Sequence, residues 1–194
     1  AETLFINICR GTGIKGLTGI RPVKDKILRP LLSRSREEII AYIEKNQLGY
    51  RTDSTNNSLD YVRNKIRHLI IPVCKEINPS FLNTVQENCD TMKEVEQIYQ
   101  YGISCLKANI VSEENGEILI DIQKTVTSPA PYTFLFEFLR PYGFNSTQIE
   151  DILNSCDAIP GKQFESGEYL LTKGRVYWRL FNILEKEEER TLLA

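Results

Sequence analysis

The sequence predicts a mostly helical α+β protein, and three features support that prediction. Apolar residues recur every three or four positions from Leu82 to Leu106, which is the period of a long amphipathic helix. Isoleucines alternate along residues 117–123, which is the period of a strand with one covered face. Residues 163–181 are predicted to form two strands around Lys173-Gly174, a pair typical of hairpin turns. The chain is therefore expected to be predominantly α.

The first predicted helix covers residues 2–10 and ends at Gly11, because glycine tolerates the positive φ that follows many helices. Its pattern is already under way at Ala1 with no capping residue before it, so we expect a cut end there. A glycine-rich segment follows and predicts a mobile loop. Residues 27–32 are short, apolar and bounded by proline, and a strand is expected there.

A capping box, in which Ser35 caps a helix and Glu38 bonds back, predicts a helix that ends at Gly49. A polar loop at 53–58 precedes another helix, expected over residues 59–71. Pro72 should stop this helix, since proline lacks an N–H and its ring clashes with the preceding turn. The apolar stripes of the two helices are expected to be Ile39, Ile43 and Leu48, and Val62, Ile66 and Ile70.

The long helix should begin at Asn78-Pro79, because proline suits the first helical position. After the isoleucine-rich strand, a helix is expected behind Pro131. A last helix should be capped by Asn145 or Ser146 and run through Asn154.

Composition limits the classes of function. No apolar run approaches the ~20 residues of a bilayer span, and no secretory pattern is visible, so a cytoplasmic protein is expected. The five cysteines have no C-x-x-C spacing, which argues against a zinc knuckle or a disulfide framework. His68 is the one histidine, and a structural role is favoured for it. With a formal net charge of −2, any nucleic-acid binding must come from a local cluster.

Residues 11–16 match the G-x-G-x-x-G pattern letter for letter. We reject a dinucleotide site, because that motif works after a strand and at the start of a helix, whereas here a helix precedes it. Two interpretations stay open. The segment is a helix end followed by a loop, or a loop in which Arg10, Lys15 and Arg21 bring cations to a phosphate near exposed backbone.

A second polar cluster combines Asp53-Ser54-Thr55-Asn56 with the helix that follows. Arg63 and Arg67, one turn apart, can clamp phosphates, and Asn64 offers a donor and an acceptor to a base edge. Tyr61 can stack on an unpaired base. Taken alone, the cluster is better explained as a solvated helix face with Asp53 capping a turn.

Together these segments resemble the tRNA(Ile)-lysidine synthetase family. The resemblance is strongest over residues 1–80 and weaker through Gly143-Phe144 and the final hairpin. The matching segments, in the family's order, are Glu2-Thr3-Leu4, Arg10-Gly11-Thr12-Gly13-Ile14-Lys15-Gly16-Leu17-Thr18-Gly19-Ile20, Arg29-Pro30-Leu31-Leu32, Asp53-Ser54-Thr55-Asn56, Tyr61-Val62-Arg63-Asn64-Lys65-Ile66-Arg67 and Asn78-Pro79.

The resemblance implies a fold. The family belongs to the N-type ATP pyrophosphatases (the PP-loop superfamily, adenine nucleotide alpha hydrolase-like), whose parallel α/β sheet binds ATP through a Ser-Gly-Gly-x-Asp-Ser loop. That loop does not occur in these 194 residues. Residues 1–75 are therefore expected to be the C-terminal part of the α/β catalytic domain. Residues 76–194 are expected to be a mostly helical α+β tRNA-binding domain with a terminal β-hairpin.

The resemblance also implies an activity. The family uses ATP with Mg²⁺ to adenylate the wobble cytidine of the CAU anticodon of tRNA(Ile), and L-lysine then displaces AMP to give lysidine. The partners are tRNA(Ile), L-lysine and ATP, with no membrane, and a homodimer is left open. Without the phosphate-binding loop, the 194 residues alone are expected not to make lysidine.

Site residues carried over from the family fall into three groups, with no metal ligand among them. The catalytic pair is Glu2 and Arg10. The ATP-phosphate set is Arg10, Gly11, Gly13 and Lys15. The tRNA set is Asp53, Asn56, Tyr61, Arg63, Asn64 and Arg67.

Two alternatives remain. A tRNA-thiolating enzyme of the same superfamily usually needs a persulfide cysteine or paired C-x-x-C ligands, and neither spacing occurs here. A stand-alone helical RNA-binding module without catalysis is the alternative from another class.

Overall fold

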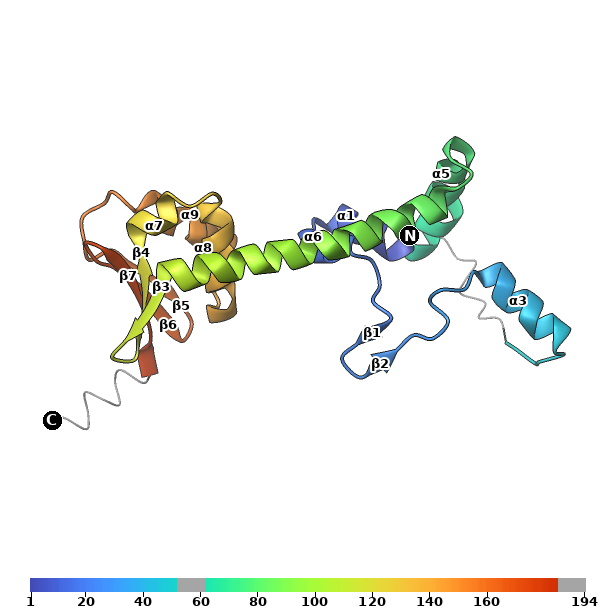
Figure 1. Ribbon diagram of the computed structural model, residues 1–194, viewed down its shortest axis with the longest axis horizontal. Helices are drawn as coiled ribbons and strands as arrows, with labels where there is room; N and C mark the ends of the chain where they lie inside the picture. The colour runs from blue at the N-terminus through green and yellow to red at the C-terminus, as the bar shows by residue number, and fades with distance from the viewer. Residues whose placement is uncertain (52–61, 185–194) are drawn as a thin grey trace. The chain divides into compact units, whose positions relative to one another are not determined.

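The computed structural model describes residues 1–51 and 62–184, which fall into two compact units, Ala1–Ile98 and Tyr99–Ala194 (Figure 1). Helix α6 (Phe81–Ile110) contributes to both units. The predicted domain limits at residues 75 and 76 stay a prediction.

The first unit begins as the sequence predicts. Helix α1 (Glu2–Arg10) ends at Gly11, whose φ of 72° is the positive value that favours glycine. The glycine-rich segment contains a short helix, α2 (Ile14–Leu17), where a loop was expected. Strands β1 (Val23–Lys24) and β2 (Ile27–Leu28) pair antiparallel. The strand expected over 27–32 is therefore shorter, because Pro30 has no N–H to extend the pairing.

Helix α3 (Arg36–Lys45) confirms the predicted capping box: the Glu38 N–H donates to the Ser35 hydroxyl, and the Ser35 N–H donates to the Glu38 carboxylate. The end expected at Gly49 is wrong. The helix stops at Lys45, and the side-chain amide of Asn46 donates to the carbonyl of Tyr42 at 2.8 Å. The chain then turns at Gln47, whose φ is 53°.

The stop expected at Pro72 is also wrong. Helix α4 (Val62–Lys65), a π-helical turn η2 (Ile66–Ile70) and helix α5 (Ile71–Ile77) follow one another without a break. Pro72 directly follows the π-helical turn, in which the Ile71 N–H donates to the carbonyl of Ile66, and the helical run continues through it. Of the predicted apolar stripe, Ile66 is buried, whereas Val62 and Ile70 are exposed.

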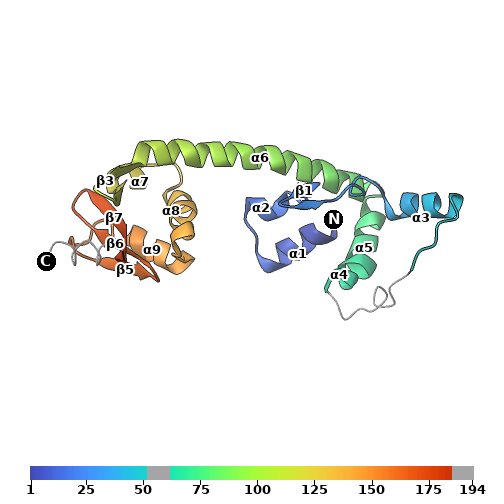
Figure 2. The same ribbon diagram turned by 90° about the horizontal axis from the view of Figure 1, so that it is seen from below.

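Helix α6 begins at Phe81, two residues after the predicted first helical position at Pro79, and the side chain of Asn78 accepts the N–H of Ser80. Figure 2 shows the first half of α6 above α1, and the Phe5 and Phe81 rings lie 6.1 Å apart. Val85 and Cys89 are the buried apolar residues that this half of α6 contributes to the first unit. The helix thus supplies one wall of that unit.

The second unit holds a five-stranded antiparallel sheet in the order β3-β4-β7-β6-β5. The strands are β3 (Val111–Glu114), β4 (Glu117–Asp121), β5 (Gln163–Ser166), β6 (Tyr169–Lys173) and β7 (Tyr177–Asn182). The predicted hairpin at Lys173-Gly174 is confirmed between β6 and β7, but residues 163–181 form three strands and not the two expected. Strand β4 ends before Ile122, because the side chain of Asp121 caps the next helix.

Helices cover one face of this sheet (Figure 1). They are α7 (Ile122–Val126), α8 (Pro131–Leu139), the 3₁₀ turn η3 (Arg140–Tyr142) and α9 (Ser146–Asn154). The predicted cap at Asn145 is confirmed as a capping box with Gln148. Phe134, Leu135, Ile149 and Trp178 are fully buried between the helices and the strands. The protein is thus a helix-rich mixed α/β fold, in agreement with the predicted class.

Candidate functional site

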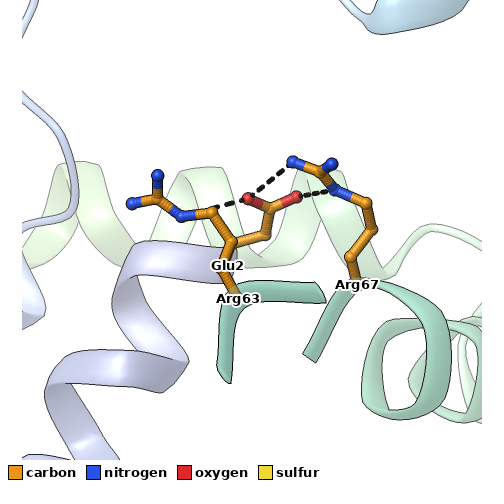
Figure 3. Close-up of polar contacts among 3 residues, drawn as sticks. All are labelled: Glu2, Arg63 and Arg67. Atoms are coloured by element: carbon orange, nitrogen blue, oxygen red, sulfur yellow. Dashed lines mark hydrogen bonds and ion pairs between the residues drawn. The ribbon is translucent and has the colours of Figure 1, made fainter. Parts of the chain in front are cut away.

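A carboxylate at the start of α1 binds an arginine of the π-helical turn (Figure 3). Arg67 Nε donates to one oxygen of Glu2 at 2.6 Å, and Arg67 Nη2 donates to the other oxygen at 3.1 Å. Two parallel N–H donors matched to two carboxylate oxygens form the strongest geometry of an arginine ion pair. The fork joins the two segments in which the family resemblance predicts catalytic and tRNA-binding residues.

Arg63 approaches the same carboxylate from one turn earlier (Figure 3), with Nε 3.7 Å from a Glu2 oxygen. Its side chain is 57% exposed, against 30% for Arg67 and 27% for Glu2. The second guanidinium is therefore held more loosely and presents more surface to solvent. Two guanidinium groups around one carboxylate leave this cluster with a net positive charge.

Hydrogen bonding with Glu2 raises the pKa of Arg67 above its ordinary value, while partial burial opposes the shift. The Arg67 guanidinium therefore stays charged throughout the physiological range. A positive cluster of this kind attracts an anion such as a phosphodiester.

The polar residues predicted to share one face of the helix that contains Arg63, Asn64 and Arg67 do not all lie on the same side. Arg63 and Arg67, four residues apart, share a face, whereas Asn64 is 6% exposed and turns inward with Ile66. Asn64 was expected beside the arginines, as a group that contacts RNA. In this structure its amide is covered, so a base contact by Asn64 would require the covering residues to move.

The glycine-rich segment is held by its own hydrogen bonds. The Asn7 side chain donates to the carbonyl of Gly16 at 2.9 Å, and the buried Thr18 hydroxyl donates to the carbonyl of Lys15 at 2.9 Å. A Cβ on Gly16 would lie 1.7 Å from the hydroxyl oxygen of Thr12, so this position requires glycine. The segment is thus a folded turn that contains a helix, and the loop expectation is corrected.

A cleft of about 690 Å³ opens beside this segment within the first unit. Among the described residues, four cations and two carboxylates line it, so its lining carries a net charge of +2. The charged lining residues are Lys15, Arg21, Lys24, Arg29, Asp25 and Glu96. A net positive cleft of this size suits a ligand that carries phosphate.

The predicted site residues are only partly brought together. Glu2, Arg63 and Arg67 meet, and Lys15 lines the cleft. Arg10 is exposed at the far end of α1, about 12 Å along the helix from Glu2 at 1.5 Å per residue.

Of the other predicted site residues, two are described by the structure and three are not. Gly11 and Gly13 flank α2 and are exposed. The predicted tRNA-binding residues Asp53, Asn56 and Tyr61 lie outside the described residues.

Sequence reasoning missed Lys24, Arg29 and Glu96 in the cleft. The position of Glu96 in the helical pattern could have revealed it. It lies seven residues after buried Cys89, so a carboxylate occupies the apolar side of α6. Such a charge is rarely buried without a partner.

A tyrosine at the start of the second unit has a strongly raised pKa. The hydroxyl of Tyr99 in α6 donates to a carboxylate oxygen of Glu137 in α8 at 3.1 Å. Burial, assisted by the hydrogen bond to Glu137, raises the pKa of Tyr99 to about 12. The bond fixes the second half of α6 to the helical layer.

Two kinds of feature are absent from residues 1–51 and 62–184. No group of three or more His, Cys, Asp or Glu side chains in these ranges is placed to hold a metal ion. Nor does any helix there combine the length and apolar character needed to cross a membrane.

Two family models match the chain. Residues 1–74 match a PP-loop domain, and residues 113–183 match the TilS substrate binding domain. The first match contains the Glu2–Arg67 pair, and the second covers the five-stranded sheet with its helices.

Curated relatives named tRNA(Ile)-lysidine synthase match nearly the whole chain. One from Bacteroides thetaiotaomicron is 45% identical over 98% of this chain and 44% of its own length. Another from Parabacteroides distasonis is 39% identical over 99% of this chain and 43% of its own length. A third, from Clostridium perfringens, is 36% identical over 84% of this chain and 36% of its own length. The chain spans less than half the length of these relatives.

The fold and the two domain matches define part of a PP-loop protein that carries a dedicated substrate-binding domain. Within that class, the chain belongs to the tRNA(Ile)-lysidine synthase family.

Proposed function

We propose that the complete protein containing these residues ligates L-lysine to the wobble cytidine of tRNA(Ile) with a CAU anticodon, at the expense of ATP. The base attacks the α-phosphorus of ATP, and pyrophosphate leaves. The amine of lysine then attacks the activated carbon of the base, AMP leaves and a proton is released. The products are lysidine, AMP and pyrophosphate.

The observation that supports this proposal best is the fork between Glu2 and Arg67. It connects a segment of the PP-loop match that the family resemblance assigns to catalysis with one that it assigns to tRNA. Arg63 stands beside the fork with most of its side chain in solvent. A single-stranded wobble base can be splayed from its stack, and cations of this kind hold its backbone during that step.

Residue roles follow from this arrangement. Arg63 and Arg67 contact the backbone of the anticodon loop, and Glu2 orients both guanidinium groups next to the reacting base. Arg10 stabilises negative charge on the α-phosphate as pyrophosphate separates. Gly11, Gly13 and Lys15 lie where a nucleotide phosphate can approach exposed backbone and a cation. The remaining proposed tRNA contacts are Asp53, Asn56, Tyr61 and Asn64.

Mg²⁺ is expected with ATP, as its usual counterion in phosphoryl chemistry. The described residues offer no set of carboxylates, cysteines or histidines that fits such an ion, so we assign it no protein ligand here. A cytoplasmic location and a homodimer remain parts of the proposal. Fractionation of cells and sedimentation of the complete protein test them.

The direct experiment incubates the complete protein with ATP, radiolabelled lysine and a tRNA(Ile) transcript with a CAU anticodon. The proposal predicts incorporation of one lysine per tRNA, with one AMP released for each. The matched control is the same transcript with uridine at the wobble position, which should accept no lysine. Binding of tRNA without incorporation would instead support a non-catalytic RNA-binding module.

A further inference from the structure

The first unit buries a carboxylate, that of Glu96, which has no role in the proposed reaction as described so far. Glu96 of α6 is 8% exposed, and its Oε2 lies 2.5 Å from Nη2 of Arg21. Burial of an ionised carboxylate is unfavourable unless a cation and hydrogen bonds compensate it. The Arg21 guanidinium is that compensation, so the two side chains fix one another.

The ion pair with Glu96 leaves half of the Arg21 side chain accessible. This side chain is 50% exposed and lines the cleft, whereas the side chain of Glu96 is 10% exposed. A guanidinium carries five N–H donors, and among the described residues the bond to Glu96 is made by Nη2 of Arg21. The other donors remain available to a ligand in the cleft, and the buried partner holds the group in one orientation.

The backbone around Arg21 is also fixed against α6. Gly19 has a φ of 72°, and a Cβ there would lie 3.1 Å from the sulfur of Cys89. Cys89 and Glu96 are seven residues apart, which places them on the same side of the helix. Arg29 donates to the carbonyl of Arg21 at 3.2 Å and so ties the β1–β2 hairpin to it. Both ends of the Arg21 side chain are thus constrained.

We propose that this cleft binds a phosphate group of a substrate, that Arg21 contacts that phosphate, and that Glu96 is the positioning residue of Arg21. The inference rests on the proposed function, because it concerns a substrate of the same reaction. Guanidinium groups match phosphate oxygens in pairs, and a fixed guanidinium loses little freedom on binding. Lys15, Lys24 and Arg29 keep the cleft positive after Glu96 has neutralised one charge.

The phosphate belongs either to ATP or to the tRNA backbone, and kinetics separate the two. Initial rates of lysine incorporation are measured while ATP, tRNA and lysine are varied in turn. We expect Arg21→Gln to raise the KM of the substrate whose phosphate Arg21 binds, either ATP or tRNA, by about tenfold or more. The reason is the loss of a charged hydrogen bond. A rise for ATP identifies a nucleotide site, and a rise for tRNA identifies a backbone site. Either result supports the proposal.

Glu96→Gln tests the positioning role, because glutamine keeps the shape and removes the charge. We expect a smaller rise in the same KM, about threefold to tenfold, with the KM for lysine unchanged. Arg21→Lys keeps the positive charge but lacks the planar guanidinium, so its KM should lie between those of the parent and Arg21→Gln. The matched control is Glu94→Gln, an exposed carboxylate on the same helix, which should behave as the parent protein.

Each failure is recognisable. If the parent protein incorporates no lysine, the proposed function itself fails. If it is active and Arg21→Gln leaves the KM values for both ATP and tRNA unchanged, the phosphate site is refuted. A purely structural role of Glu96 would lower the melting temperature and the activity toward all three substrates together, and this result would refute the positioning role.

Discussion

Glu2 and Arg67 lie 65 positions apart in the sequence, yet they form a two-bond fork with N–O distances of 2.6 and 3.1 Å. The fork links the first turn of α1 to a π-helical turn. Such turns often occur at functional sites. The neighbouring Arg63 shares the carboxylate at 3.7 Å but stays mostly in solvent. The two arginines are therefore expected to differ in what they do.

Arg67→Ala should destabilise the first unit, because it leaves the partly buried carboxylate of Glu2 without its two hydrogen bonds. We expect the free energy of unfolding to fall by about 1–3 kcal/mol, the range for loss of a charged hydrogen-bond partner. Urea denaturation of the complete protein measures it. Arg34→Ala removes an ion pair that is more than half exposed on both sides, and it should cost less than about 1 kcal/mol. Equal effects of the two substitutions would show that the fork has no special weight.

Gly16→Ala should disturb the glycine-rich turn. The added Cβ would overlap the side chain of Thr12, whose hydroxyl oxygen and Cβ lie 1.7 and 2.6 Å away. Rotation of Thr12 relieves the first contact but not the second. We expect a loss of about 1–3 kcal/mol in the free energy of unfolding, as for other overpacked sites, together with reduced lysine incorporation.

The control for that substitution is Gly13→Ala. A Cβ at Gly13 meets no atom of the described residues within 4 Å, and its φ of −78° suits any residue. Alanine is a poorer N-cap than glycine, and this loss should cost about 1 kcal/mol or less. If Gly16→Ala lowers the free energy of unfolding no more than Gly13→Ala does, the close packing of Gly16 against Thr12 is contradicted.

Tyr99→Phe should change how stability depends on pH. The pKa of Tyr99, about 12, is raised above its ordinary value of 10.0, chiefly by burial and then by the bond to Glu137. A folded-state pKa above the unfolded one adds stability that is complete below pH 10 and is lost as the pH rises toward 12.

At pH 8 the parent should therefore be more stable than Tyr99→Phe by about 0.5–1.5 kcal/mol, the usual range for one hydrogen bond. This difference should shrink between pH 10 and pH 12, because phenylalanine does not titrate. Denaturant midpoints of both proteins across this range provide the test. A difference that stays constant would show that the Tyr99 hydroxyl does not ionise differently on folding.

Local signals in the sequence predicted local structure well. The capping boxes at Ser35 and Asn145 mark real helix starts, and Gly11 marks a real helix end, because each depends on neighbouring backbone groups. Pro72 misled the prediction. The helical run passes through this proline directly after a π-helical turn, and single-residue rules do not report such a turn.

Rules based on neighbouring residues do not predict contacts between residues far apart in the sequence. The pairing of Glu2 with Arg67 and that of Arg21 with Glu96 depend on how α1, η2 and α6 pack. The same packing buries Asn64 while its neighbour Arg63 remains exposed, although both lie in one polar run of the sequence. A helical period predicts which residues share a face, but not which face the rest of the protein covers.

The most direct test of the account is the affinity of the complete protein for tRNA(Ile), measured across a series of salt concentrations for the parent and for Arg63→Ala. The exposed Arg63 guanidinium is assigned to a phosphate, so its removal should weaken binding about fivefold or more and lower the slope of log Kd against log salt by about one. An unchanged slope and an unchanged Kd in a folded variant would contradict the central claim that the Glu2–Arg63–Arg67 cluster faces the RNA.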